Sequence, residues 1–174
     1  FAFFGGNIGI HEGLITATNN ENELAAVMAH EIAHIAQDHM LRQIAQQRQL
    51  LPITLAEALA VIAIGKPDLI LPVLAGHGQQ VINFTREHEK EADRLGIQIL
   101  AKAGFDPQSM PTLFQHMSQH SRYDSRPPEY LLTHPVYESR IADARHRADS
   151  FKYQQSPSSL SYYLIKARVQ ALSN

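Results

Sequence analysis

The stretch His30-Glu31-Ile32-Ala33-His34 decides how the rest of the chain is interpreted. It lies inside Leu24–Gln37, whose apolar spacing predicts a helix. Two histidines at i and i+4 lie one turn apart on the same helical face, so their imidazoles can converge on one Zn²⁺. Glu31 stands where a carboxylate can take a proton from a metal-bound water. Two partly exposed histidines on a surface helix would give the same pattern, so the rest of the chain must decide.

The composition narrows the classes of function. The 174 residues are 44% hydrophobic and 18% charged, with a formal net charge of −2, which suits one domain with a buried core. Because the sequence has no basic stripe, we expect no nucleic-acid partner. The absence of cysteine excludes a thiol nucleophile, a disulfide framework and a Cys-based zinc site. No apolar run reaches the ~20 residues that span a bilayer.

The beginning of the chain predicts a small β-structure. The sequence starts abruptly at Phe1 with no visible signal peptide, so we interpret it as a processed or trimmed fragment. Residues 1–15 predict a strand, a tight turn at Gly5-Gly6-Asn7 and a second short strand at Ile8–His11. Asn20, with Glu23 three residues later, predicts a capping box at the start of the helix that carries the histidines.

That helix has one apolar arc, formed by Leu24, Met28, Ile32 and Ile35. The two histidines border this arc, so we expect them at the edge of the core. Such a position is dry enough to polarise a bound water and open enough for a substrate. We expect the helix to run on through Gln37–Gln49.

Residues 50–84 allow two interpretations. Their apolar segments are interrupted by Glu57 and by Lys66-Pro67-Asp68, which predicts two short buried helices joined at Pro67. The alternative is a mobile or membrane-touching hairpin near the active site. Gly76-His77-Gly78 indicates a flexible turn.

A second strong helix is predicted over Thr85–Ala103, with Thr85 as its cap and Gly104 as the residue that ends it. At 100° per residue, Glu89 and Asp93 share one face of this helix. Gly96 extends that face and would let the helix approach the histidine helix closely. We therefore predict Glu89 as the third zinc ligand. Asp93, one turn on, is predicted to hydrogen-bond the far nitrogen of a ligating histidine.

The other face of this helix predicts a solvated charged surface, formed by Glu87, Lys90, Glu91 and Arg94. We also expect His88 to be exposed. The remaining histidines with no matching constellation are predicted to be surface or structural residues, and they are His11, His39, His116, His120 and His146.

The second half of the chain predicts further helices. One begins at Asp106-Pro107 and runs to about Gln119, and a loop follows over Arg122–Tyr130. Another runs from Pro135 to about Ser150. Leu160–Leu172 is predicted to be a terminal helix with no role in the site.

With these residues in hand, the sequence resembles the gluzincin metallopeptidases, the family that includes HtpX and the CAAX prenyl endopeptidases. This resemblance is carried by His30-Glu31-x-x-His34 followed by Glu89-x-x-x-Asp93. The chain also resembles one periplasmic branch of the family, in which a protease domain precedes tetratricopeptide repeats. Four stretches in the branch's order carry that resemblance, and they are Phe1–Gly6, Glu89–Gly96, Gly104-Phe105-Asp106-Pro107 and the stretch from Arg126 to Arg140.

The resemblance implies an α+β, mainly α fold, with a zincin-like metalloprotease core and a small N-terminal β-sheet packed on the HExxH helix. Residues 1–152 would form the protease domain, whose N-terminal part is absent. Residues 153–174 would form a linker and a terminal helix at the start of the tetratricopeptide repeats.

The resemblance also implies a function. The protein would be a zinc endopeptidase with one Zn²⁺ per chain, in the periplasm of a Gram-negative bacterium. It would act in the assembly and quality control of outer-membrane β-barrel proteins, on unfolded or misassembled protein substrates. Partners in the outer-membrane assembly machinery would bind through C-terminal repeats absent from this chain, and peripheral membrane association is part of the same expectation.

By position, the resemblance assigns roles to the motif residues. His30, His34 and Glu89 match the metal ligands, and Glu31 matches the general base. Asp93 matches a carboxylate that supports the metal ligands from behind, and Arg140 matches an arginine that braces the site. His134 matches a histidine near the metal. His134 has three open interpretations, which are a fourth zinc ligand, a donor to the oxyanion and a plain histidine at a helix start. We hypothesise that its loop switches between the first two, which would make the protease latent.

A further expectation concerns the reaction. Ile8, Gly9, Ile10 and His11 are predicted to form an exposed edge that pairs with an extended substrate and so selects unfolded chains.

Two alternatives to an enzyme are a non-catalytic assembly chaperone that keeps zinc for structure and a cytosolic structural zinc protein. The intact Glu31 and the presence of only three strong protein ligands favour the enzyme over the chaperone. The structural zinc protein fits poorly, because structural zinc sites are usually closed and rich in cysteine.

Overall fold

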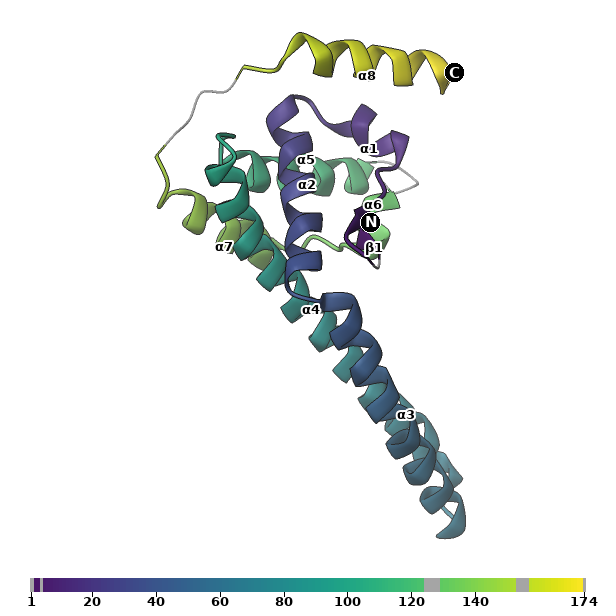
Figure 1. The fold of residues 1–174 in the computed structure, drawn as a ribbon. Helices are drawn as coiled ribbons and strands as arrows, with labels where there is room; N and C mark the ends of the chain where they lie inside the picture. The colour runs from purple at the N-terminus through teal and green to yellow at the C-terminus, as the bar shows by residue number, and fades with distance from the viewer. Residues whose placement is uncertain (1, 4, 124–128, 153–156, 174) are drawn as a thin grey trace.

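The computed structural model describes residues 2–3, 5–123, 129–152 and 157–173, and most of them are helical (Figure 1). At the N-terminus, β1 (Ala2–Phe3) pairs antiparallel with β2 (Asn7–Ile8). Gly5 and Gly6 form the turn with φ of +80° and +79°, values that glycine adopts without strain. The predicted hairpin is confirmed, except that β2 ends at Ile8 and the chain enters α1 (Glu12–Ala17).

The core forms between α2 (Glu21–Ala36) and the C-terminal half of α4 (Ile70–Lys102). The predicted cap of α2 is present, since Asn20 Oδ1 accepts a hydrogen bond from the Glu23 N–H at 2.9 Å. Glu23 in return accepts from the N–H of Asn19, one residue before the predicted partner. Side chains buried between and around these helices include Ala26, Val27, Ile97, Leu100 and Phe114.

Three later helices complete the globular part, and they are α5 (Ser109–Tyr123), α6 (Glu129–Thr133) and α7 (Glu138–Ala148). Gly104 has φ of +84° after α4, which confirms it as the residue that ends this helix. Asp106 caps the Gln108 N–H, so regular helix begins at Ser109 rather than at Pro107. α7 likewise begins three residues later than predicted. Of the predicted loop at 122–130, residues 124–128 lie outside the described part of the chain.

A helical hairpin projects from the globular part (Figure 1), and it corrects two predictions. It consists of α3 (His39–Ala63), the 3₁₀ turn η1 (Pro67–Leu69) and the N-terminal half of α4. The prediction of short buried helices was wrong, because the two arms are long and pack mainly on each other. Gly76-His77-Gly78 is not a turn but lies within α4.

The hairpin also changes two predicted helix ends. The predicted continuation through Gln37–Gln49 was wrong, because Asp38 adopts φ of +52° and separates α2 from α3. Thr85 is not a cap, since α4 already runs from Ile70 and the Thr85 hydroxyl donates to the Val81 carbonyl. Pairing with α3 supports the early turns of α4, which local capping signals cannot indicate.

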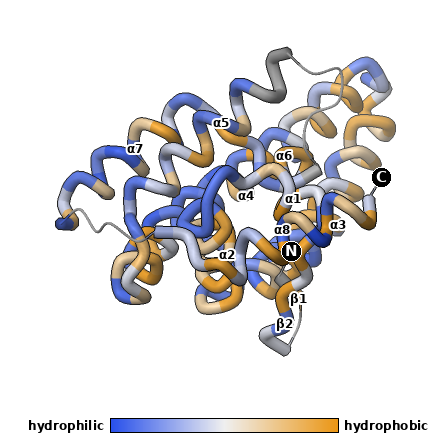
Figure 2. The backbone as a smooth tube through the Cα atoms, turned by 90° about the horizontal axis from the view of Figure 1, so that it is seen from above, coloured by the Kyte–Doolittle hydropathy of each residue, from blue (hydrophilic) through white to orange (hydrophobic). Residues whose placement is uncertain are grey.

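The terminal helix α8 (Leu160–Leu172) has the predicted bounds. It lies at the opposite end of the molecule from the hairpin (Figure 1) and packs against α1, with the Tyr162 hydroxyl donating to the Thr18 carbonyl at 2.9 Å. Orange and blue segments alternate along the helices in Figure 2, as amphipathic helices require. None of the described helices is long and apolar enough to cross a membrane.

Candidate metal centre

The side chains of His30, His34, Glu89 and His134 converge, with one ligand atom of each within 4.8 Å of the others. His34 Nε2 lies 2.9 Å from His30 Nε2 and 3.3 Å from Glu89 Oε1. His30 Nε2 lies 3.5 Å from Glu89 Oε2. Ligands bound to zinc at about 2.0–2.2 Å in a tetrahedron stand roughly 3.4 Å apart. The residues therefore fit one zinc ion.

Two helices bring the three predicted ligands together. α2 supplies His30 and His34 one turn apart, and α4 supplies Glu89. A Cβ built on Gly96 would lie 3.3 Å from the His30 backbone, which confirms that this glycine permits close approach of the two helices. His30 and Glu89 are both buried.

Asp93 and Arg140 stand behind the ligands, as predicted. Asp93 Oδ1 lies 2.9 Å from His30 Nδ1, the nitrogen that faces away from Glu89. Arg140 donates two hydrogen bonds of 2.7 Å to the Asp93 carboxylate and one to the Pro135 carbonyl. Its guanidinium also lies 2.8 Å from Glu89 Oε2. One buried cation thus faces two buried carboxylates.

These contacts set the protonation of the site. Burial raises the pKa of Glu89, but hydrogen bonds from the three surrounding histidines outweigh it and hold that pKa well below its ordinary value. The same competition lowers the pKa of Asp93, through its bonds with His30 and Arg140. Burial lowers the pKa of His30, but the bonds with the two carboxylates raise it to about 9. Glu89 is therefore anionic at neutral pH, as a metal ligand must be.

His134 lies between the ligands and Glu31. Its Nδ1 is 3.0 Å from Glu89 Oε1 and 3.4 Å from His30 Nε2, and its Nε2 is 3.4 Å from Glu31 Oε1. The ring stacks on Tyr130 with centroids 4.8 Å apart. One imidazole therefore faces the ligands with one nitrogen and the predicted general base with the other.

A cleft of about 610 Å³ opens onto these side chains. Glu31, Glu89 and His134 line it, together with the β1–β2 turn at Gly5 and Gly6. The predicted substrate-binding residues Ile8, Gly9, Ile10 and His11 are not among the lining residues. The His11 Nδ1 instead accepts the Gly13 N–H and caps α1. The pairing of this segment with substrate stays a prediction.

Comparison with known proteins identifies the family. Residues 1–148 match the model of peptidase family M48. The chain belongs to this family. It is 46% identical over 180 residues to the beta-barrel assembly-enhancing protease (BepA) of Escherichia coli K12. The match covers 100% of this chain and 37% of that protein.

Other M48 relatives extend the comparison. A putative beta-barrel assembly-enhancing protease of Vibrio cholerae is 47% identical over 178 residues, covering 98% of this chain and 37% of that protein. The mitochondrial metalloendopeptidase OMA1 of Schizosaccharomyces pombe is 30% identical over 141 residues, covering 81% of this chain and 41% of that protein. The resemblance stated from the motifs is confirmed. This M48 chain spans just over a third of the length of its bacterial relatives.

Two further histidines of this M48 chain lie beside the predicted metal ligands, and one of them is His39, which was predicted to be a surface or structural residue. His39 is buried, with Nδ1 2.8 Å from His34 Nδ1 and Nε2 3.2 Å from Glu91 Oε2. His88, expected to be exposed, is buried and stacks on His39 with centroids 4.2 Å apart. Burial and the neighbouring His34 lower the pKa of His39 to about 4.

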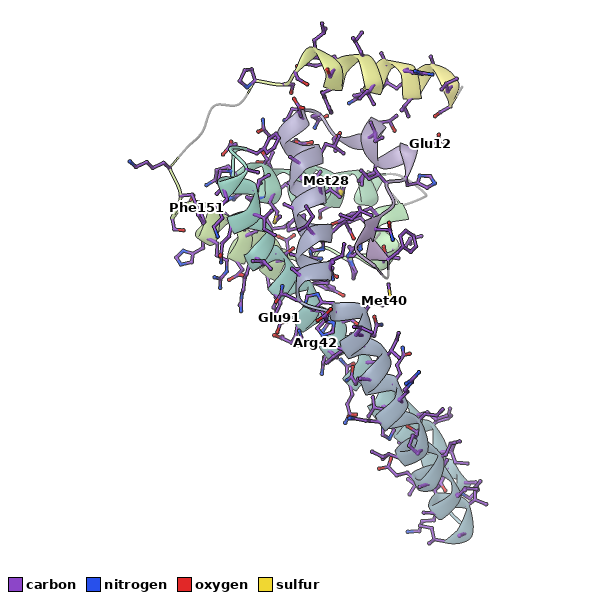
Figure 3. The ribbon with its side chains drawn as sticks, viewed as in Figure 1. Glu12, Met28, Met40, Arg42, Glu91 and Phe151 are labelled. Atoms are coloured by element: carbon purple, nitrogen blue, oxygen red, sulfur yellow. The ribbon has the colours of Figure 1, made fainter. Side chains whose placement is uncertain are left out.

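Periodicity could not reveal His39. On a continuous helix, a residue five positions after His34 points about 140° away from it. The positive φ of Asp38 ends α2 and turns His39 back onto His34. Arg42, at the base of the hairpin, closes the cluster by donating to Glu91 Oε2 at 2.6 Å (Figure 3). Glu91, expected on a solvated face, is thus half-buried, whereas Glu87 is exposed as predicted.

Proposed function

We propose that this chain is the catalytic domain of a zinc-dependent endopeptidase that hydrolyses unfolded or misassembled proteins during outer-membrane β-barrel assembly and quality control. One observation carries the proposal. His34, Glu89 and the carboxylate of Glu31 line one cleft, and His30 is buried beside them in the same cluster. Catalytic zinc sites combine three protein ligands with an open position. The printed names of the bacterial relatives support the substrate class.

In this proposal His30, His34 and Glu89 hold one zinc ion. When bound, zinc lowers the pKa of a water molecule and polarises the substrate carbonyl. Glu31 takes the proton of the attacking water and delivers it to the leaving amine. Its carboxylate is 2% exposed at the wall of the cleft, so bulk water does not compete for that proton. Asp93 holds the ring of His30 in position, and Arg140 holds Asp93.

His134 gives the proposal a resting state. With Nδ1 among the ligand atoms, it would occupy the open position, and its Nε2 would engage the Glu31 carboxylate. Both the water site and the general base would then be blocked, so the protease would be latent. A movement of the His134 loop would free both groups and leave the imidazole available to donate to the oxyanion.

We also propose a domain organisation, a cellular location and partners for this protein. Residues 1–152 form the protease domain, and residues 153–174 form the linker and the helix at the start of tetratricopeptide repeats. The protein works in the periplasm, and the repeats contact the outer-membrane assembly machinery. The Gram-negative sources of the relatives support this envelope location, and the relatives' greater length leaves room for further domains.

The hairpin supports peripheral association with a membrane. Residues 50–84 contain three charged side chains, Glu57, Lys66 and Asp68. Leucines and isoleucines are exposed along both arms, including Leu51, Leu55, Leu59, Ile62, Ile64 and Leu71. An apolar projection of this kind is stabilised where it contacts lipid at the interface.

Removal and return of the metal tests the proposed activity. A chelator should abolish cleavage of an unfolded substrate such as casein, and one equivalent of Zn²⁺ should restore it. Glu89→Gln should weaken zinc binding and cleavage, because it removes a charged ligand. Glu87→Gln is the matched control, two residues earlier on the exposed face, and should keep both. Equal behaviour of the two variants would contradict the ligand assignment.

A further inference from the structure

The tautomer of His34 follows from its surroundings. Its Nε2 lies among the ligand atoms of His30 and Glu89, so this nitrogen must offer a lone pair to a bound ion. A neutral imidazole carries its proton on the other nitrogen. The Nδ1 of His34 is therefore an N–H donor, and its neighbour at 2.8 Å is Nδ1 of His39.

The tautomer of His34 also determines the tautomer of His39. Because His34 donates, the Nδ1 of His39 must accept, and the proton of His39 must stand on its Nε2. That nitrogen lies 3.2 Å from Glu91 Oε2, which accepts. Arg42 donates to the same oxygen at 2.6 Å and neutralises the carboxylate. Every donor in the series meets one acceptor.

We propose that His39 is a positioning residue for the metal ligand His34, fixing its tautomer and ring orientation, and that Glu91 and Arg42 fix His39 in turn. This inference rests on the proposed function, because it needs a metal at the site. It adds a group behind the second histidine, as Asp93 stands behind the first. Partners of this kind commonly change metal affinity by 10–100-fold, ~1.4–2.7 kcal/mol.

The packing around His39 suits a fixed acceptor. Its ring lies parallel to that of His88 within 4°, and His88 contacts Phe84 on α4. His39 is the first residue of α3, so one arm of the hairpin supplies the group that orients His34. The base of the hairpin is therefore connected to the metal ligand through hydrogen bonds, in addition to apolar packing.

Zinc affinity and the visible spectrum of bound Co²⁺ together distinguish a positioning role of His39 from a role in packing alone. Purified metal-free protein is titrated with Zn²⁺ against a chromophoric chelator, and with Co²⁺ to record its visible spectrum. His39→Phe keeps an aromatic ring on His88 but removes both nitrogens, and it should weaken zinc binding about 10–100-fold and alter the cobalt spectrum. His39→Asn places an amide oxygen near the Nδ1 position and should recover most of the affinity and the spectrum. His146→Phe, at an exposed site, is the control.

The inference is overturned if His39→Phe binds zinc with wild-type affinity, or if His39→Phe and His39→Asn weaken zinc binding equally. In either case, zinc binding by the wild-type protein leaves the proposed function standing. A wild-type protein that binds no zinc overturns both. If circular dichroism shows that His39→Phe does not fold, Glu91→Leu is the second variant, because this half-buried carboxylate can be replaced without opening the core. Unchanged zinc affinity and cobalt spectrum in Glu91→Leu would then overturn the inference.

Discussion

Gly96 and His30 lie so close that a Cβ at position 96 would be 3.3 Å from the Cα and N atoms of His30. The contact joins α4 to α2 about two turns from Glu89, so it sets the distance between the proposed carboxylate ligand and the proposed histidine ligands. The same Cβ would be 2.9 Å from the tip of Met110, which closes the other side. The backbone contact cannot yield by a change of rotamer.

Gly96→Val should therefore push the two helices apart. We expect a loss of about 1–3 kcal/mol in the free energy of unfolding, measured by chemical denaturation, together with weaker zinc binding. Gly76→Val is the matched control, because a Cβ at this other α4 glycine meets nothing within 4 Å. That variant should stay within about 0.5 kcal/mol of wild type. Equal stability of the two variants would contradict the close approach.

Arg140 should be a large contributor to stability, although it is charged and buried. Arg140→Met leaves the carboxylates of Asp93 and Glu89 without their cation, and we expect a loss of about 3–5 kcal/mol in the free energy of unfolding. Adding Asp93→Asn should recover part of it, since one unpaired charge is then removed. The measurement is urea denaturation of metal-free protein. A loss of unfolding free energy in the double variant that equals or exceeds the sum of the two single losses would argue against this pairing.

His134→Ala tests latency. If His134 occupies the open metal position and holds Glu31, its removal should lower zinc affinity and raise the basal rate of casein cleavage. Both are measured on the same zinc-loaded preparation. A lower rate with unchanged affinity would assign His134 to the oxyanion alone, and no change in either quantity would refute the switch.

The hairpin should bind lipid through its exposed leucines. Replacing Leu51, Leu59 and Leu71 together by Ser should reduce co-flotation with vesicles of phosphatidylethanolamine and phosphatidylglycerol. The control replaces three leucines of α8, Leu160, Leu164 and Leu172, by Ser. All six leucines are between 62% and 76% exposed, so the two variants lose similar apolar surface. Equal loss of flotation, or no binding by wild type, would contradict a lipid-binding hairpin.

The arrangement of the candidate metal centre was predictable because helical periodicity determines it. His30 and His34 share a face four residues apart, and the same arithmetic separates Glu89 from Glu91 on α4. Gly96 then indicated which face of α4 approaches α2. The positions of His30, His34 and Glu89 do not depend on loop conformation, because regular helices carry all three residues.

The wrong predictions concern features that the local sequence pattern does not encode. Thr85 and Gly76 carry local signals for a helix start and a turn, but pairing with α3 continues α4 through both. Asp38 changes the chain direction through one backbone angle, which no apolar pattern encodes, and so His39 was missed. The apolar composition of residues 50–84 predicted burial, whereas most of these side chains face solvent.

In the proposed mechanism, Glu31 performs proton transfer at a site whose metal is held by other residues. The most direct measurement compares casein cleavage by wild type and Glu31→Gln, both shown to carry one zinc per chain. We predict a rate for Glu31→Gln lower by at least about 10²-fold with zinc content and unfolding temperature unchanged. Cleavage by fully zinc-loaded Glu31→Gln at the wild-type rate would show that Glu31 is not the general base.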